Sequence, residues 1–377
     1  MRFSVFLNGR STAPENDRPF IEATIAHAAR AAELGFDALF LPDHHFTGYM
    51  PVASDPMMFA AYLTAKFPEL HIGFSVTSVP LHSPVRFVER VNIIDQLTGG
   101  KILVGVGSGT TPEEMIGFGV NYAEASKVSE ENLEIAERLW AKRPEDPPVA
   151  FDTGHYKGEV LQRIAPTPYA QRHPRLMPVA MKEASARRAA ENGWPAFIPA
   201  FTPPKIGGPD PLSHVTKYFN RYRELLEAAG HPAAVVADAL SWSTHTYQCV
   251  HLAPTDEQAR EELIEILTAY QAAVDREKAF NDKAETNAEN KKTDETPLAL
   301  TEDWIATWCL YGSPETVVEH LKPYAALGIG NILCGATTGP LTERRLALAD
   351  QTLDLLAREV LPYFQSARPA ARVAAAR

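Results

Sequence analysis

The chain has 377 residues, of which 45% are hydrophobic and 22% are charged, as expected for a globular protein with a substantial core. Its formal charge of -11 argues against a general nucleic-acid binder, because neutralising phosphates requires a basic face. No stretch reaches the roughly 18 apolar residues that a membrane span needs, and the three cysteines lack metal-type spacing. We therefore expect a cytoplasmic protein with free thiols that binds neither membranes nor nucleic acids.

Short apolar segments alternate with helical patterns along most of the chain. Strands are predicted at residues 2–7, 38–41, 71–76, 102–106, 176–181, 196–198 and 330–334, with one more strand or a strand pair within 234–250. The expected helices cover residues 19–35, 55–67, 84–97, 126–140, 213–229, 256–270, 314–327 and 342–360, and another ends at Gly193.

This alternation predicts a parallel sheet, and eight strands favour a single (β/α)8 barrel spanning residues 1–377. A doubly wound sheet is the weaker alternative, because no G-x-G-x-x-G follows the first strand. Two segments interrupt the pattern. Residues 144–174 are proline-rich, with a small hairpin expected around Phe151 and Tyr156. Residues 275–297 are charged and poor in apolar groups, which predicts an exposed insertion.

Asp43, His44 and His45 follow the second predicted strand, at the end where barrels place their catalytic groups. A carboxylate and two imidazoles could bind a metal, but adjacent residues on an extended chain point in opposite directions. We therefore predict no metal. One imidazole suffices as a general base, since its pKa lies near 6.5. The alternative is that the histidines only pack within the loop.

A glycine-rich loop, residues 105–109, follows the fourth predicted strand. It has Thr110 where the dinucleotide fingerprint requires its third glycine, so it is a weak nucleotide signal. Glycines there could instead let the backbone approach a flat ligand, or simply form a tight turn.

Met181, Lys182 and Ser185 stand where the fifth strand leads into a helix, and free N–H groups at a helix start favour an anion. Lys182 could hold a phosphate there or be solvated. Phe46, Tyr49, Phe201 and Trp242 are predicted near other strand ends and suggest an apolar substrate pocket. Such a pocket suits a long-chain aldehyde and a hydrophobic natural-product intermediate equally well.

Several motifs together resemble the bacterial luciferase-like family of flavin-dependent monooxygenases, and the luciferase catalytic subunit in particular. They are GFD and HHFT within residues 35–47, AAYL at 60–63, HSPVR at 82–86, VNxxDQ at 91–96, GSPETV at 312–317 and GIGNILCG at 328–335.

The resemblance implies a barrel, commonly dimeric, that receives reduced FMN from a separate reductase. In such enzymes a flavin hydroperoxide formed with O2 oxygenates an aldehyde, a ketone or another acceptor. By position His44 matches the catalytic base, with His45 beside it. The resemblance also implies a non-proline cis peptide at Ser75–Val76 and a mobile lid at residues 275–297.

Three positions depart from the family pattern. Ser108 stands where the family often has a phosphate-binding arginine, and Lys182 where luciferase has a serine. We expect Lys182 to supply the missing positive charge, with Ser108, Ser185 and the N–H of Met181 as further donors. Gly107 replaces a reactive luciferase cysteine, which argues against light emission but not against oxygenation.

Two other functions remain open on the sequence. One is a deazaflavin-dependent oxidoreductase on the same barrel, which transfers hydride without oxygen. The other is a non-catalytic flavin-binding or partner subunit, which the retention of His44 and His45 disfavours.

Overall fold

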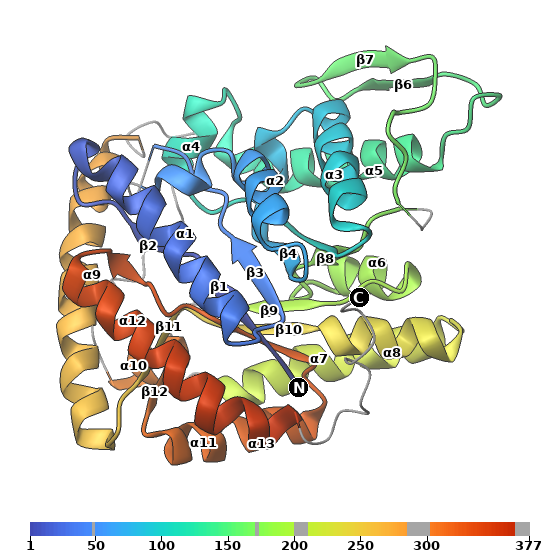
Figure 1. Cartoon of the computed structure of the whole chain (residues 1–377). Coiled ribbons are helices and arrows are strands. Elements are labelled where there is room, and N and C mark those ends of the chain that lie inside the picture. Colours follow the sequence, from blue (N-terminus) through green and yellow to red (C-terminus); the bar gives the residue numbers. More distant parts are fainter. Residues whose placement is uncertain (47–49, 170–172, 200–209, 285–301, 366–377) are drawn as a thin grey trace.

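The computed structural model describes residues 1–46, 50–169, 173–199, 210–284 and 302–365, arranged around one parallel sheet (Figure 1). In spatial order its strands are β8 (Leu176–Pro178), β5 (Ile102–Gly107), β4 (His71–Ser78), β3 (Ala38–Leu41), β1 (Arg2–Phe6), β13 (Asn331–Cys334), β10 (Thr244–Tyr247) and β9 (Phe197–Pro199). A parallel bridge between Val179 and Phe197 joins the two outermost strands, β8 and β9. The predicted (β/α)8 barrel is therefore confirmed.

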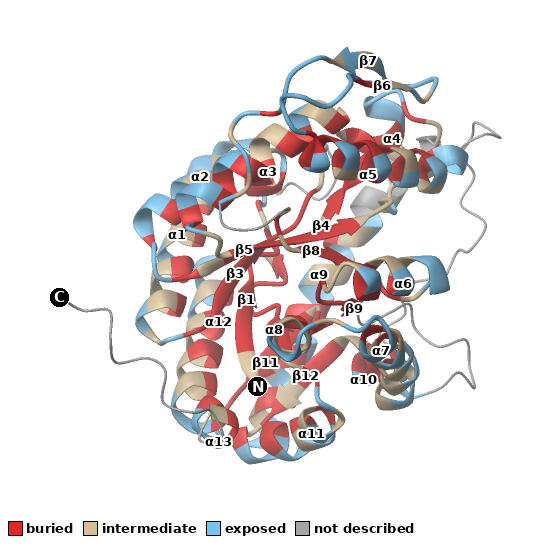
Figure 2. Cartoon of the chain, turned by 90° about the vertical axis from the view of Figure 1, so that its right-hand side faces the viewer, coloured by how far each residue is buried: buried red, intermediate tan, exposed pale blue. Residues whose placement is uncertain are grey.

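Helices surround the barrel and each turns one face toward it, so exposed residues gather on their outer sides (Figure 2). The main ones are α1 (Asp17–Glu33), α2 (Pro56–Lys66), α3 (Pro84–Thr98), α5 (Ala125–Ala141), α6 (Glu183–Glu191), α7 (Pro211–Ala228), α11 (Pro314–Leu327) and α12 (Glu343–Leu355). Local sequence sets their starts. At α2, for example, the Asp55 carboxylate accepts the N–H of Met58 and Pro56 opens the first turn.

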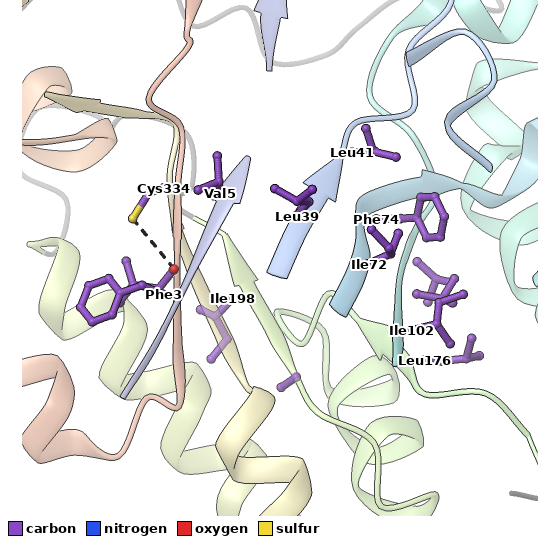
Figure 3. Close-up of a cluster of buried hydrophobic side chains, with 14 of the residues drawn as sticks. Phe3, Val5, Leu39, Leu41, Ile72, Phe74, Ile102, Leu176, Ile198 and Cys334 are labelled. Atoms are coloured by element: carbon purple, nitrogen blue, oxygen red, sulfur yellow. Dashed lines mark hydrogen bonds between the residues drawn. The ribbon is translucent and has the colours of Figure 1, made fainter. Parts of the chain in front are cut away.

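The strands are buried on both faces, as their continuous apolar runs predict. Phe3, Val5, Leu39 and Leu41 point toward the helices and belong to the main core (Figure 3). The alternate residues, such as Phe6 and Phe40, form a second cluster within the barrel.

The prediction for residues 234–250 is partly wrong. Residues Ala233–Trp242 form a helix, α8, and only then come β10 and a further strand, β11 (Cys249–Leu252). The segment is rich in alanine, a strong helix former, and buries Ala239 and Trp242 three residues apart on one side. The neighbouring valines suggested a strand, but the three-residue spacing of the buried side chains fits a helix.

The helix predicted at residues 256–270 is longer than expected and enters the charged segment 275–297. Helix α9 (Asp256–Ala284) continues through the first ten of these residues, and residues 285–297 lie outside the described chain. Charged residues cannot build a core, yet Arg, Glu, Lys and Ala all favour a helix. The predicted hairpin, by contrast, is confirmed as the antiparallel pair β6 (Val149–Asp152) and β7 (Lys157–Val160).

The predicted closing helix, residues 342–360, is divided. It comprises α12, a π-helical turn at Leu356–Val360 and a short α13 (Leu361–Gln365). Among the described residues, no helix is both long and apolar enough to cross a membrane.

Candidate active site

His44 lies in the loop just beyond β3 and contacts a buried carboxylate. Its Nδ1 is 2.9 Å from Glu114 Oε1, and the same oxygen accepts the N–H of His45 at 3.0 Å. The Glu114 side chain is 1% exposed, whereas that of His44 is 38% exposed. A carboxylate only accepts hydrogen bonds, so an ionised Glu114 places a proton on Nδ1 of His44. Nε2 then carries the lone pair that a general base requires.

The pair also sets the protonation of His44. Burial by itself would lower the pKa of this imidazole, but the hydrogen bond and charge of Glu114 outweigh it and raise the pKa above its usual value. His44 therefore takes up a proton readily and holds it where a neighbouring ligand could receive it.

His45 turns the other way, toward Asp43. Its Nε2 is 3.1 Å from Asp43 Oδ1, while Asp43 Oδ2 accepts the N–H of Ser78 at 2.8 Å and lies 2.9 Å from Nε2 of His82. Burial would raise the pKa of Asp43, but the hydrogen bonds of His45 and His82 hold it well below its usual range. Asp43 therefore ties the loop after β3 to the end of β4.

Within the described ranges, no group of three or more His, Cys, Asp and Glu side chains is arranged to hold a metal ion. Asp43 instead contacts His45 and His82, and His44 contacts Glu114.

Glu114 was not predicted from the sequence, and it lies on a short helix, α4 (Pro112–Gly117), after the glycine loop. Gly109 has a φ of 74°, and a Cβ there would lie 2.2 Å from Cε of Met115, so glycine lets α4 fold back onto the loop. Pro112 at the helix start, followed by two glutamates, is a signal that could have predicted α4. His82 was also missed, although it begins the HSPVR motif.

The glycines of β5 allow β4 to approach closely. A Cβ at Gly105 would lie 2.1 Å from the carbonyl oxygen of Phe74, and one at Gly107 would lie 2.8 Å from Cγ2 of Val76. The Ser75–Val76 peptide is cis, which confirms the expectation drawn from the resemblance. Ser75, Val76 and Gly107 are half-buried.

Lys182 stands before α6 and is tied to α5. Its Nζ donates a hydrogen bond to Ser126 Oγ at 3.0 Å, and Ser129 Oγ, one turn along the same helix, donates to the Gly107 carbonyl at 3.5 Å. One face of α5 therefore connects the Lys182 segment with the end of β5, where the half-buried Ser108 follows. Ser126 is a further polar group that the sequence analysis did not identify.

Met181 and Ser185 are half-buried on either side of the exposed Lys182. They flank the start of α6, where free N–H groups and the Lys182 ammonium suit a phosphate. Val76 and the glycines of β5 offer apolar and backbone surface on the neighbouring strands. These residues fit a flat ring system that bears a phosphate tail.

Phe46 and an unpredicted partner, Phe118, form apolar surface beside the histidines. Their rings stack with centroids 5.7 Å apart, and Phe118 meets His45 edge-on at 4.5 Å. Phe46 is 61% exposed and Phe118 40% exposed. Tyr49 and Phe201, which were predicted to share this pocket, lie outside the described residues.

The prediction that Trp242 follows a strand and lines this pocket is wrong. Trp242 ends α8, and its ring contacts the imidazole of His71 at 4.3 Å and the guanidinium of Arg2 at 4.2 Å. Both partners begin strands, so Trp242 lies at the end of the barrel opposite to His44.

Comparison with known proteins identifies relatives with this architecture. The family described as "Luciferase-like monooxygenase" matches residues 1–331. The chain is 25% identical over 233 residues to 4-hydroxyprotoasukamycin monooxygenase of Streptomyces nodosus subsp. asukaensis, covering 62% of this chain and 59% of the relative. It is 27% identical over 186 residues to the alkanal monooxygenase alpha chain of the Kryptophanaron alfredi symbiont, covering 49% and 50%. The matches thus span less than two thirds of either relative.

Solved structures share the fold over nearly the whole chain. Monooxygenase RslO1 from Streptomyces bottropensis has a TM-score of 0.74 at 21% identity, covering 97% of this chain and 100% of that one. The oxygenating constituent of 3,6-diketocamphane monooxygenase from Pseudomonas putida, in complex with FMN, has a TM-score of 0.71 at 18% identity. The match covers 96% of this chain and 98% of that one. Coenzyme F420 dependent tetrahydromethanopterin reductase from Methanopyrus kandleri has a TM-score of 0.62 at 17% identity, and the match covers 96% of this chain and 99% of that one. At these identities the structures establish the fold alone, but the match over residues 1–331 establishes that this chain belongs to the luciferase-like monooxygenase family.

Proposed function

We propose that the chain is the oxygenase of a two-component, FMN-dependent monooxygenase that acts on an apolar substrate. The observation that carries the proposal is the contact between His44 and the buried Glu114, at the end of the barrel where β4 and β5 present Val76 and Gly107. A base with a raised pKa beside a surface suited to a flat ligand fits the chemistry of this family.

The residues have distinct roles in this proposal. His44 holds or accepts a proton at Nε2, Glu114 orients the imidazole, and Asp43 and His45 fix the loop. Lys182, Ser126, Ser108 and Ser185 bind the phosphate. Reduced FMN, when bound, supplies the electrons with which O2 is activated.

The substrate is proposed to be an apolar aldehyde, ketone or natural-product intermediate. Phe46 and Phe118 support this class, because their stacked rings leave apolar surface next to His45. Both curated relatives described above are named as monooxygenases, one of an alkanal and one of 4-hydroxyprotoasukamycin.

Two partners belong to the proposal. A separate reductase supplies reduced FMN, because the glycine loop lacks the third glycine of a dinucleotide fingerprint and so offers no evident nicotinamide site. A second copy of the chain forms a homodimer. Turnover that starts only when a flavin reductase and NADH are added would support the first partner, and turnover with NADH alone would contradict it.

The cofactor is tested by anaerobic titration with reduced FMN and, separately, with reduced F420. The proposal predicts tight binding of reduced FMN, with 18O from labelled O2 appearing in an oxygenated aldehyde or ketone. Tight binding of F420 alone, with oxygen-independent reduction of an acceptor, would instead identify a deazaflavin oxidoreductase. That second candidate is kept because the Methanopyrus kandleri enzyme with the same fold is F420 dependent. Binding of either cofactor without any turnover would indicate a non-catalytic subunit.

A further inference from the structure

Two of the three cysteines face each other outside the barrel. Strands β11 and β12 (Cys309–Gly312) form a separate parallel pair, in which Cys249 is the register partner of Cys309. Partners in register project their side chains to the same face. The two residues are 1% and 3% exposed and lie in one apolar cluster with Leu263, Ile266 and Trp304. Neighbouring strands lie about 4.8 Å apart, within the range of Cα separations that a disulfide spans.

A buried arginine adds an independent observation. Arg345, on α12, is 5% exposed, and its Nε donates to the Thr338 carbonyl at 2.9 Å. Its two terminal nitrogens have no hydrogen-bond partner among the described residues. A buried guanidinium needs a compensating negative charge, and the charges that act on Arg345 are those of Cys249 and Glu265.

The two thiols are accordingly unequal. The hydrogen bond from Cys309, helped by the charge of Arg345, lowers the pKa of Cys249 in spite of its burial. The same hydrogen bond, together with burial, raises the pKa of Cys309. Of the two thiols, Cys249 is therefore the one that loses its proton more readily.

Cys334 provides a natural contrast within the chain. It lies on β13 in the main core (Figure 3), where burial raises its pKa to about 12. Its strand partners in register are Val5 and Tyr247, so Cys334 faces no second thiol there and, with its raised pKa, is a poor nucleophile.

We propose that Cys249 and Cys309 are a reversible redox pair, which forms an intramolecular disulfide when the protein meets a peroxide. The Cys249 thiolate attacks one peroxide oxygen and becomes a sulfenic acid, and the other oxygen leaves as water after taking a proton. Cys309 then attacks the sulfenic sulfur, the S–S bond forms, and hydroxide leaves and takes up the Cys309 proton as water. Two thiols lose two electrons in total, and one hydrogen peroxide becomes two waters.

The Cys249–Cys309 disulfide would link the strand that follows β10 of the barrel to the strand that follows α10. β11 follows β10 after Gln248, whose carbonyl accepts a hydrogen bond from Asn8 Nδ2 at 3.0 Å. β12 directly follows α10 (Glu302–Trp308), so a disulfide would close the segment from Cys249 to Cys309, which contains α9. The proposal does not depend on which flavin the protein binds.

The test uses the purified full-length chain and a small excess of hydrogen peroxide. After quenching, the protein is denatured, alkylated with N-ethylmaleimide and analysed by intact mass and peptide mapping. Wild type should fall from three alkylated thiols to one, with a Cys249–Cys309 cross-linked peptide, and dithiothreitol should restore all three. Cys334→Ser should fall from two to none.

Single-cysteine variants test the assigned order of reaction. Cys309→Ser should stop at a sulfenic acid that dimedone traps on Cys249, whereas Cys249→Ser should give no dimedone adduct on Cys309. Retention of three thiols in wild type, a bridge to Cys334 or a disulfide between two chains would overturn the proposal.

Discussion

The two histidines after β3 differ in the carboxylate that each contacts. His44 pairs with Glu114 and His45 with Asp43, although the histidines are adjacent in sequence. Their place after a strand predicted that one of the two imidazoles is a base, and the resemblance to the luciferase-like family singled out His44. The sequence did not predict Glu114, because His44 and Glu114 are 70 positions apart and meet only when α4 folds back over the loop.

Glu114→Gln tests whether this carboxylate positions and charges His44. The amide removes the charge that raises the pKa of His44, so that pKa should fall. A general base works when deprotonated, and the acidic limb of the pH profile of kcat/KM should therefore move to lower pH. The maximal kcat should fall about tenfold, because the imidazole is less firmly oriented.

Glu113→Gln is the matched control. Glu113 neighbours Glu114 on α4 but makes no hydrogen bond to His44 among those described. Glu113→Gln should therefore leave the acidic limb of the kcat/KM profile in place. An unchanged pH profile in Glu114→Gln would contradict the assignment of Glu114 as a positioning residue.

Lys182→Ala tests the proposed phosphate site. Loss of one exposed, charge-assisted contact should raise the Kd for reduced FMN roughly tenfold. Binding of reduced riboflavin, which has no phosphate, should not change. Anaerobic fluorescence titration measures both, with Lys157→Ala on the β6–β7 hairpin as the control. Equal FMN affinities in Lys182→Ala and wild type would exclude Lys182 from the site.

At the level of elements, β4 and β5 depend on glycine where they approach each other. Gly105→Ala places a methyl group against the backbone oxygen of Phe74, which cannot move aside as a side-chain end could. The free energy of unfolding should drop by about 1 to 3 kcal/mol, measured by urea denaturation.

Gly158→Ala provides the comparison. There the Cβ would meet the end of the Phe151 ring on the β6–β7 hairpin, and this ring can turn away. The free energy of unfolding should therefore change by less than about 0.5 kcal/mol. Equal losses in the two variants would show that the β4–β5 approach is not specially constrained.

Most elements were predictable because their signals are local. The Asp55–Pro56 start of α2, the apolar run of β3 and Gly99 after α3, with a φ of 62°, each follow from a few neighbouring residues. Residues 233–242 were predicted as a strand because valines favour strands locally. They form a helix instead, because Ala239 and Trp242 are buried along one helical side.

For the whole molecule, the regular alternation of strands and helices was sufficient to predict the barrel. The residues that join β8 to β9 were not predictable, because that contact is an isolated bridge between Val179 and Phe197 and no regular strand pairing. The same limit applies to Trp242. Which end of the barrel it reaches depends on whether its segment is a strand or a helix.

The proposed homodimer is expected to use α2 and α3, which pack side by side (Figure 1). Four large apolar residues on these helices are between 45% and 72% exposed, namely Met58, Tyr62, Ile93 and Leu97. Ile93→Glu combined with Leu97→Glu would place like charges across a two-fold axis and should yield monomers in sedimentation velocity.

The control for this surface is Leu161→Glu. Leu161 is 61% exposed and lies just beyond the β6–β7 hairpin, so its replacement should leave the dimer intact. A wild-type chain that sediments as a monomer at micromolar concentration would contradict the proposed dimer.

The most direct test of the account is a stopped-flow experiment on the oxygen reaction. Reduced FMN is bound anaerobically to wild type or to His44→Ala and then mixed with oxygenated buffer, while the flavin spectrum is followed. Wild type should form a long-lived oxygenated flavin. An apolar aldehyde or ketone should accelerate its decay in wild type and should affect it much less in His44→Ala. Immediate reoxidation in wild type, as for free flavin, would contradict the monooxygenase assignment.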